Sequence, residues 1–146
     1  MPAPEVGGGG IGLSDRAFVV HPESPQQLGD FVAMDSDTGE VLWCRRSRWQ
    51  YGTAVLTTAG GLVFVGDIDR HMYAFDARDG TELWRTRTPT ATDGFPITYA
   101  VGGRQYVAVP SGPGWSLAWR NARQVFPEDM QRPPGSGSVL QVFALP

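Results

Sequence analysis

The sequence predicts an all-β protein built from repeated antiparallel sheets, and three observations lead to this prediction. The 146 residues include 19 glycines and 12 prolines with few helix-forming runs, which favours short strands and many turns. The pattern Ala-x-Asp-x-x-x-Gly-x-x-x-Trp occurs twice, at 33–43 and 74–84, with a period of 41 residues. Repeats of that length are typical of solenoids and propellers. The residues between the two copies predict further strands and turns that complete a four-stranded unit, which is the blade of a β-propeller.

Each fixed position of the repeat has a physical role. The aspartate ends a strand, where its carboxylate can accept turn amides. The glycine supplies the positive φ that a tight hairpin turn needs. The tryptophan is predicted to wedge between neighbouring blades, so that Trp84→Ala costs about 3–5 kcal/mol of stability. These residues are Asp35, Gly39 and Trp43 in the first copy, and Asp76, Gly80 and Trp84 in the second.

The chain divides into a Gly/Pro-rich N-terminal segment, residues 1–16, and a partial propeller, residues 17–146. The first blade is expected to have strands at 17–20, 31–35 and 41–44. The second is expected to have strands at 51–57, 62–65, 71–76 and 83–87. A Gly60-Gly61 turn precedes 62–65, and the continuous apolar character of that run (LVFV) predicts burial on both faces. The blades are predicted to span about 17–46, 51–87 and 95–146.

The third blade departs from the pattern in its second half. Strands are expected at 95–99 and 105–110, with a Gly102-Gly103 turn between them. An insert at 111–137 then interrupts the blade before the pattern resumes at 138–145, and no fourth strand follows. About three blades cannot close a ring, because propellers need roughly four to eight. We therefore expect the chain to be the tail of a longer propeller, or to associate with further copies of itself.

Composition excludes several classes of protein. The formal charge of −3 leaves no basic footprint for nucleic acid or an anionic membrane. No apolar run is long enough to span a bilayer, and residues 1–13 lack the features of a secretory signal. The single cysteine, Cys44, cannot form an internal disulfide.

Five stretches resemble one enzyme family. The two Ala-x-Asp-x-x-x-Gly-x-x-x-Trp repeats resemble the tryptophan-docking motif of the quinoprotein dehydrogenases, eight-bladed propellers that bind pyrroloquinoline quinone (PQQ). Residues 57–66 (TTAGGLVFVG) look like the family's TAGG(D)LVF-x-G strand pair, and PITY with GRQYVAV, within 96–109, is similar to its PVTY…GKQYVAV segment. The ending VFALP, 142–146, looks like the C-terminus of many members. The resemblance covers about residues 30–146 and indicates the C-terminal blades.

The resemblance implies the oxidation of an alcohol or sugar hydroxyl in the periplasm. PQQ would accept two electrons while calcium, or a lanthanide, polarises its quinone carbonyl. Cytochrome c or ubiquinone would receive the electrons. In the family the metal ligands and the general base come from earlier blades, and this sequence contains none of those segments. We therefore assign no catalytic and no metal-binding residue, and we predict that the chain alone neither binds PQQ tightly nor turns over substrate.

Three residues are candidates for contact with the cofactor. A Gly-Gly-Trp after the QYVAV strand brings a tryptophan to the rim of the PQQ pocket in the family, and Gly114 and Trp115 match its last two positions. The alternative for Trp115 is packing within the insert. Trp49 lies near the place where the family has an aromatic residue before TAGG, although the spacing differs by a few residues.

Other polar residues have simpler explanations. His71 is expected to pack in the core or at the rim, and His21 has no Cys or His at ligand spacing, so no zinc site is predicted. Asp67 and Asp69 lie in a turn between strands, and turn hydrogen bonding is the better explanation for them. Asp93 precedes an inner strand and could face the axial channel.

Two other functions fit the same repeats. One is a non-catalytic propeller scaffold that binds partner proteins. The other is a partial propeller that completes a ring from several copies. The TAGG segment and the Pro-Gly-Trp insert favour the dehydrogenase, because a scaffold needs neither.

Overall fold

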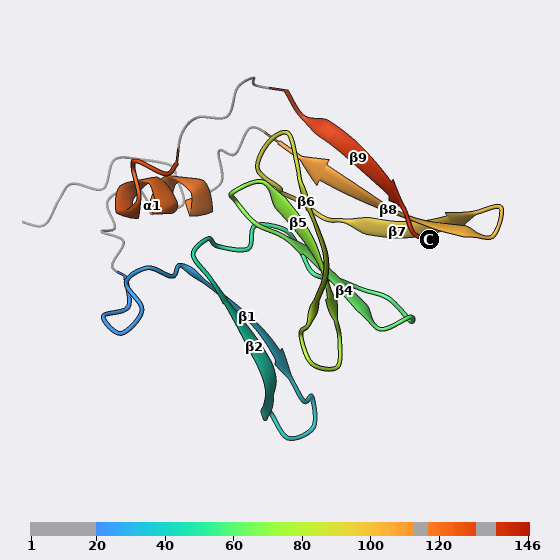
Figure 1. Ribbon diagram of the computed structural model, residues 1–146, viewed down its shortest axis with the longest axis horizontal. Coiled ribbons are helices and arrows are strands. Elements are labelled where there is room, and N and C mark those ends of the chain that lie inside the picture. The colour runs from blue at the N-terminus through green and yellow to red at the C-terminus, as the bar shows by residue number, and fades with distance from the viewer. Residues whose placement is uncertain (1–19, 113–116, 131–136) are drawn as a thin grey trace, which may run out of the picture.

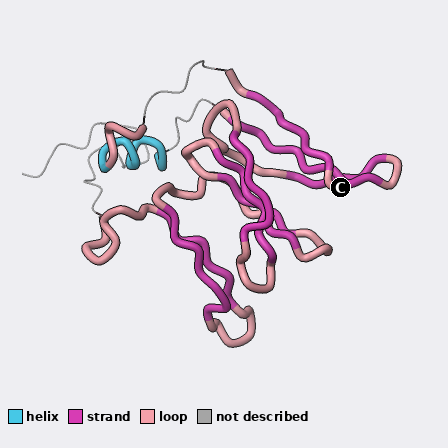
Figure 2. The backbone as a smooth tube through the Cα atoms, in the orientation of Figure 1, coloured by secondary structure: helices cyan, strands magenta, loops and turns pink. Residues whose placement is uncertain are grey.

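The computed structural model describes residues 20–112, 117–130 and 137–146, which form three antiparallel sheets arranged in chain order (Figure 1). Strands dominate these residues, with one short helix lying apart from the sheets (Figure 2). The described part of the chain therefore forms an open series of sheets, as the repeat predicts.

The strands follow the predicted units. The first sheet has two strands, β1 (Gly29–Met34) and β2 (Val41–Ser47). The second has four, in the order β3-β4-β5-β6: Leu56–Thr57, Leu62–Gly66, His71–Asp76 and Glu82–Arg87. The third has three, in the order β7-β8-β9: Ile97–Val101, Arg104–Ser111 and Val139–Ala144.

The hairpins of the two repeat copies have the predicted geometry. Gly39 and Gly80 have φ angles of 73° and 71°. The Asp35 carboxylate accepts the Asp37 and Thr38 amides at 2.9 and 2.8 Å. Asp76 accepts the Arg78 amide at 2.9 Å, and that arginine's side chain lowers the pKa of the Asp76 carboxyl to about 2. In both copies the strand register also shifts directly after the alanine of the repeat, Ala33 or Ala74, so the similarity of the two copies extends to a backbone irregularity.

Four expectations about elements need correction. Of the strand predicted at 17–20, residues 17–19 lie outside the described residues, and Val20 is not in a strand. The strand predicted at 51–57 is reduced to Leu56–Thr57, with isolated bridges at Tyr51 and Thr53. Its first half instead connects two sheets, because the Gly52 amide donates to Gly66 O and the Ala54 amide to Gly94 O.

The first strand of the third sheet begins at Ile97 and not at 95. Gly94 has a φ of 116°, and Pro96 has no amide to donate, so regular pairing starts only after them. The insert contains the helix α1 (Leu117–Val125), which the sequence analysis did not predict. The nine residues LAWRNARQV contain no glycine or proline, whereas glycine and proline occur on each side of them in the sequence. This composition favours a short helix that is limited at both ends.

The core lies between the second and third sheets. It comprises Phe64, Met72, Ala74, Val107 and Val109, with Leu56, Leu62, Phe143 and Leu145 packed against them. Residues 63–66 of β4 are all buried, which confirms the predicted burial of both faces of this strand. Core packing thus joins the β4–β5 pair to the β8–β9 pair.

The tryptophans of the two repeats contact the next sheet to different degrees. The Trp43 side chain is 9% exposed, and its indole N–H donates to Ala77 O at 3.0 Å. Its ring lies so close to Gly80 that a Cβ there would approach it to 2.8 Å. The Trp84 ring makes an edge contact with Phe143, at 5.1 Å between centroids, but remains 36% exposed. Because this much of Trp84 is exposed, we expect a smaller loss for Trp84→Ala than the roughly 3–5 kcal/mol predicted from the sequence.

Candidate functional site

The candidate site lies at one end of the first two sheets, where the connecting loops contact the insert that contains α1. The connection 48–54 lies there, and the polypeptide around α1 packs against it. A small apolar cluster marks the contact, consisting of Ile68, Ala122 and Met130 with Leu28 and Trp49 packed against it. This arrangement places one predicted cofactor residue, Trp49, under the insert.

Trp49 is half-buried and has fixed surroundings. Its ring makes a near-perpendicular contact with Phe126, at 5.7 Å between centroids. Its amide donates to the Ser47 hydroxyl at 3.1 Å. The backbone around it is also constrained, because a Cβ on Gly29 would meet Trp49 O at 2.3 Å. Gly114 and Trp115, the other two predicted cofactor residues, lie outside the described residues.

A buried polar cluster lies beside this end, centred on Asp67. The Asp67 side chain is fully buried, and its carboxylate accepts the His71 amide at 2.9 Å and the Tyr73 hydroxyl at 2.7 Å. Its backbone carbonyl accepts the Thr92 hydroxyl at 2.7 Å. Accepting the His71 amide confirms the predicted turn role of Asp67, but the full burial of its carboxylate was not predicted.

Burial shifts the ionisation of this cluster. Desolvation raises the pKa of the Asp67 carboxyl above its ordinary value, although the hydrogen bonds from Tyr73 and His71 oppose the shift. Desolvation and the neighbouring Asp67 charge raise the pKa of Tyr73 as well. The imidazole Nδ1 of His71 lies 3.7 Å from oxygens of both Asp67 and Asp69. A buried carboxyl with a perturbed pKa can mark a functional site or a structural network. Here the carboxylate accepts hydrogen bonds only from His71 and Tyr73 of its own blade among the described residues, so it fastens the turn after β4 to β5.

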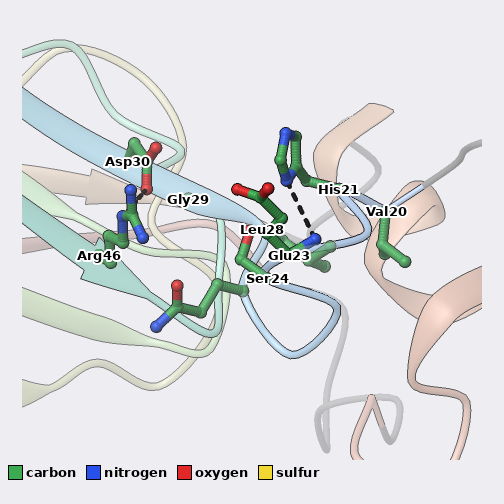
Figure 3. A pocket seen from close by; sticks show the side chains of 9 residues that line it. Val20, His21, Glu23, Ser24, Leu28, Gly29, Asp30 and Arg46 are labelled. Carbon is green, nitrogen blue, oxygen red and sulfur yellow. Dashed lines mark hydrogen bonds and ion pairs between the residues drawn. The ribbon is translucent and has the colours of Figure 1, made fainter.

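The remaining polar candidates do not converge on one centre. Asp93 is exposed. His21 is exposed too, and lines a pocket of about 330 Å³ in which its Nδ1 accepts the Glu23 amide at 3.3 Å (Figure 3). In the same pocket, Arg46 lies 3.9 Å from Asp30.

Metal-binding residues are not gathered in the described ranges, which contain no group of three or more His, Cys, Asp or Glu able to hold an ion. These residues therefore offer no candidate ligand group for the metal that the resemblance implies. The Cys44 thiol is free and exposed. Over the same part of the chain, no helix has the length and apolar character needed to cross a bilayer.

Two features of this end were absent from the sequence prediction. One is the burial of Asp67, for which the only signal was its position directly after the apolar run LVFVG. The other is the packing of α1 and the turn after it on Trp49. Apolar residues at 122, 126 and 130 recur every four positions, which is a helical spacing that could have indicated it.

Four-stranded antiparallel sheets repeated along the chain are the blades of β-propeller proteins, and the three sheets of the described residues, with two, four and three strands, follow one another in chain order as such blades do. The family model "Glucose/ethanol/alcohol dehydrogenase, beta-propeller domain", designated PQQ, matches residues 29–107, which is more than half of the chain. The chain belongs to this family of PQQ-dependent dehydrogenases, and its sheets are β-propeller blades.

Known relatives agree with this assignment. The chain is 36% identical over 119 residues to a quinoprotein ethanol dehydrogenase of Pseudomonas aeruginosa, covering 82% of this chain and 19% of the relative. It is 38% identical over 140 residues to a 1-butanol dehydrogenase (cytochrome c) of Thauera butanivorans, covering 93% and 19%. Among solved structures, a europium-containing methanol dehydrogenase matches with a TM-score of 0.64 and 27% identity, covering 80% of this chain and 23% of that one. The chain thus spans about a fifth of the length of these relatives.

Proposed function

We propose that this chain is the C-terminal portion of the propeller of a PQQ-dependent dehydrogenase that oxidises an alcohol or sugar hydroxyl. The family match over residues 29–107 is the observation that carries the proposal. The relatives named for ethanol and 1-butanol favour a small alcohol as the substrate. The proposal includes the periplasm as the site of the reaction.

In this proposal the chain contributes structure and the remaining blades contribute chemistry. PQQ with calcium or a lanthanide would supply the oxidising centre, and the europium in one related structure supports the lanthanide. Cytochrome c is the favoured electron acceptor, because the 1-butanol dehydrogenase carries it in its name, with ubiquinone as the alternative. Trp49, Gly114 and Trp115 remain the proposed contacts with PQQ.

The proposal predicts that the chain alone is inactive. No metal-ligand group exists in its described part, and its sheets end in exposed apolar strands that further blades would cover. Purified chain should show neither stoichiometric PQQ binding with Ca²⁺ or La³⁺ nor dye-linked oxidation of ethanol. Tight PQQ binding or alcohol turnover by the chain alone would contradict the proposal that this chain contributes structure and the remaining blades contribute chemistry.

A chimera tests the parent activity directly. The matching segment of the P. aeruginosa ethanol dehydrogenase is replaced by residues 29–146 of this chain, and a second version lacks the segment altogether. We expect dye-linked alcohol oxidation from the first and none from the second. A folded chimera that binds PQQ but oxidises no alcohol or sugar would refute the proposed activity. The self-assembling propeller would be favoured if the chain alone formed a monodisperse dimer or trimer and the chimera that carries its segment were inactive.

A further inference from the structure

Arg48 connects three segments that are distant in the sequence. Its guanidinium donates to the Gln26 side-chain oxygen at 2.5 Å and forms an ion pair with the Asp129 carboxylate. It also lies over two aromatic rings, with its central carbon 3.8 Å from the centre of Phe126 and 5.5 Å from that of Trp49. One side chain therefore contacts the loop before β1, its neighbour Trp49 in the connection after β2, and the turn that follows α1.

The surroundings of Arg48 make it suited to hold the insert in place. Beneath it, Ala122 and Met130 of the insert are buried against Ile68, and Phe126 contacts the Trp49 ring. This apolar contact is small, so the insert's attachment depends more than usual on the polar contacts at its edge. An arginine fits this position because its planar group can stack on a ring and donate to two acceptors at once.

The neighbouring arginine provides a contrast. Arg46 lies two residues earlier, on β2, and forms an ion pair with Asp30 of the adjacent strand at 3.9 Å. Its side chain is largely exposed. The two arginines belong to the same basic run, RRSRW, so the sequence alone did not distinguish them.

We propose that Arg48 is a positioning residue, which fastens the α1 insert to the end of the first sheet and thereby fixes the ring of Trp49. In the assembled dehydrogenase, this anchor keeps the insert over the loop end of the blades. The effect on the reaction rests on the proposed function, whereas the anchoring itself does not.

Hydrogen exchange in the complete chain tests the anchoring. Amide exchange in peptides covering 117–130 is followed by mass spectrometry for the parent, Arg48→Ala, Arg48→Lys and the control Arg46→Ala. We expect Arg48→Ala to accelerate exchange about tenfold, since it removes a charge-assisted hydrogen bond and a cation–π contact. Arg48→Lys, which keeps the charge but not the planar stacking, should fall between, and Arg46→Ala should match the parent. Unchanged exchange in Arg48→Ala would overturn the anchor.

The same variants in the ethanol dehydrogenase chimera test the positioning role, and exchange is measured there too if the isolated chain does not fold. We expect Arg48→Ala to raise the KM for the alcohol about threefold or more with little change in kcat, since the segment positions groups but carries no catalytic base. Arg48→Lys should raise the KM by less than Arg48→Ala does, and Arg46→Ala should leave the KM unchanged. Faster exchange with unchanged kinetics would overturn the positioning role. An inactive parent chimera would refute the proposed function, and the exchange data would still decide on the anchor.

Discussion

The two blade interfaces use equivalent tryptophans in unequal surroundings. At the first interface Trp43 is almost fully buried, its N–H has an acceptor, and the turn of the next hairpin, with Gly80, lies against its ring. At the second interface Trp84 contacts Phe143 but borders an apolar cavity of about 410 Å³ between the second and third sheets. The third sheet ends at β9 within the described residues, so no hairpin turn covers Trp84 as the 76–80 turn covers Trp43. We therefore expect the tryptophan to contribute its full stabilisation only where the next blade is complete.

The largest effect is expected for Trp43→Ala. Removing this ring leaves a cavity beside Phe31 and an unpaired Ala77 carbonyl, so the free energy of unfolding should fall by about 3–5 kcal/mol. Urea unfolding of the complete chain, followed by circular dichroism, measures it. Equal losses for Trp43→Ala and Trp84→Ala would show that the two interfaces do not differ.

Substitution of the facing glycine should have the next largest effect. Gly80→Ala adds a methyl group 2.8 Å from the Trp43 ring in a residue with positive φ, and we expect a loss of about 2–4 kcal/mol. Gly39→Ala is the matched control, because Gly39 has the same backbone conformation with nothing within 4 Å of the added Cβ. It should lose only about 1–2 kcal/mol by the same urea experiment. Identical losses would mean that the ring contact carries no energy.

Trp84→Ala should cost less than either change at the first interface. About a third of this side chain is already exposed, so we expect a loss of about 1–2 kcal/mol. The same substitution in the chimera sharpens the comparison. If a complete neighbouring blade covers Trp84 there, the loss in thermal stability should approach that of Trp43→Ala. A loss in the chimera no larger than in the isolated chain would argue against this coverage.

The smallest effect concerns the pH dependence of stability within the second blade, where the buried Asp67 carboxylate accepts the Tyr73 hydroxyl. Because burial raises the pKa of the folded-state carboxyl above its ordinary 3.8, the unfolded chain loses this proton first. Stability should therefore fall as the pH rises from about 4 through the folded-state pKa. Asp67→Asn should lose this dependence. The melting temperature of the variant relative to that of the parent should therefore be higher at pH 8 than at pH 4. Asp37→Asn, at an exposed turn position, is the control and should keep the parent's dependence.

Local chemistry explains why much of the fold was predictable. Asp35 and Asp76 accept turn amides, and Gly39 and Gly80 adopt positive φ, because these roles depend only on residues within one hairpin. The apolar run of β4 predicted its own burial in the same way. Strand boundaries were less accurate where a segment connects two sheets, as at Gly52 and Gly94, since those hydrogen bonds join residues far apart in the sequence.

The sequence by itself determined the repeat, the blade hairpins and the family, because spacing and turn residues are properties of neighbouring positions. Only the tertiary structure decided which tryptophan is buried, that the Asp67 carboxylate lies in the interior, and that Arg48 rather than Arg46 contacts the insert. The physical reason is that burial and pairing depend on which surface the rest of the chain brings opposite a residue. Two copies of one motif, identical at four positions, therefore acquire different energies from different neighbours.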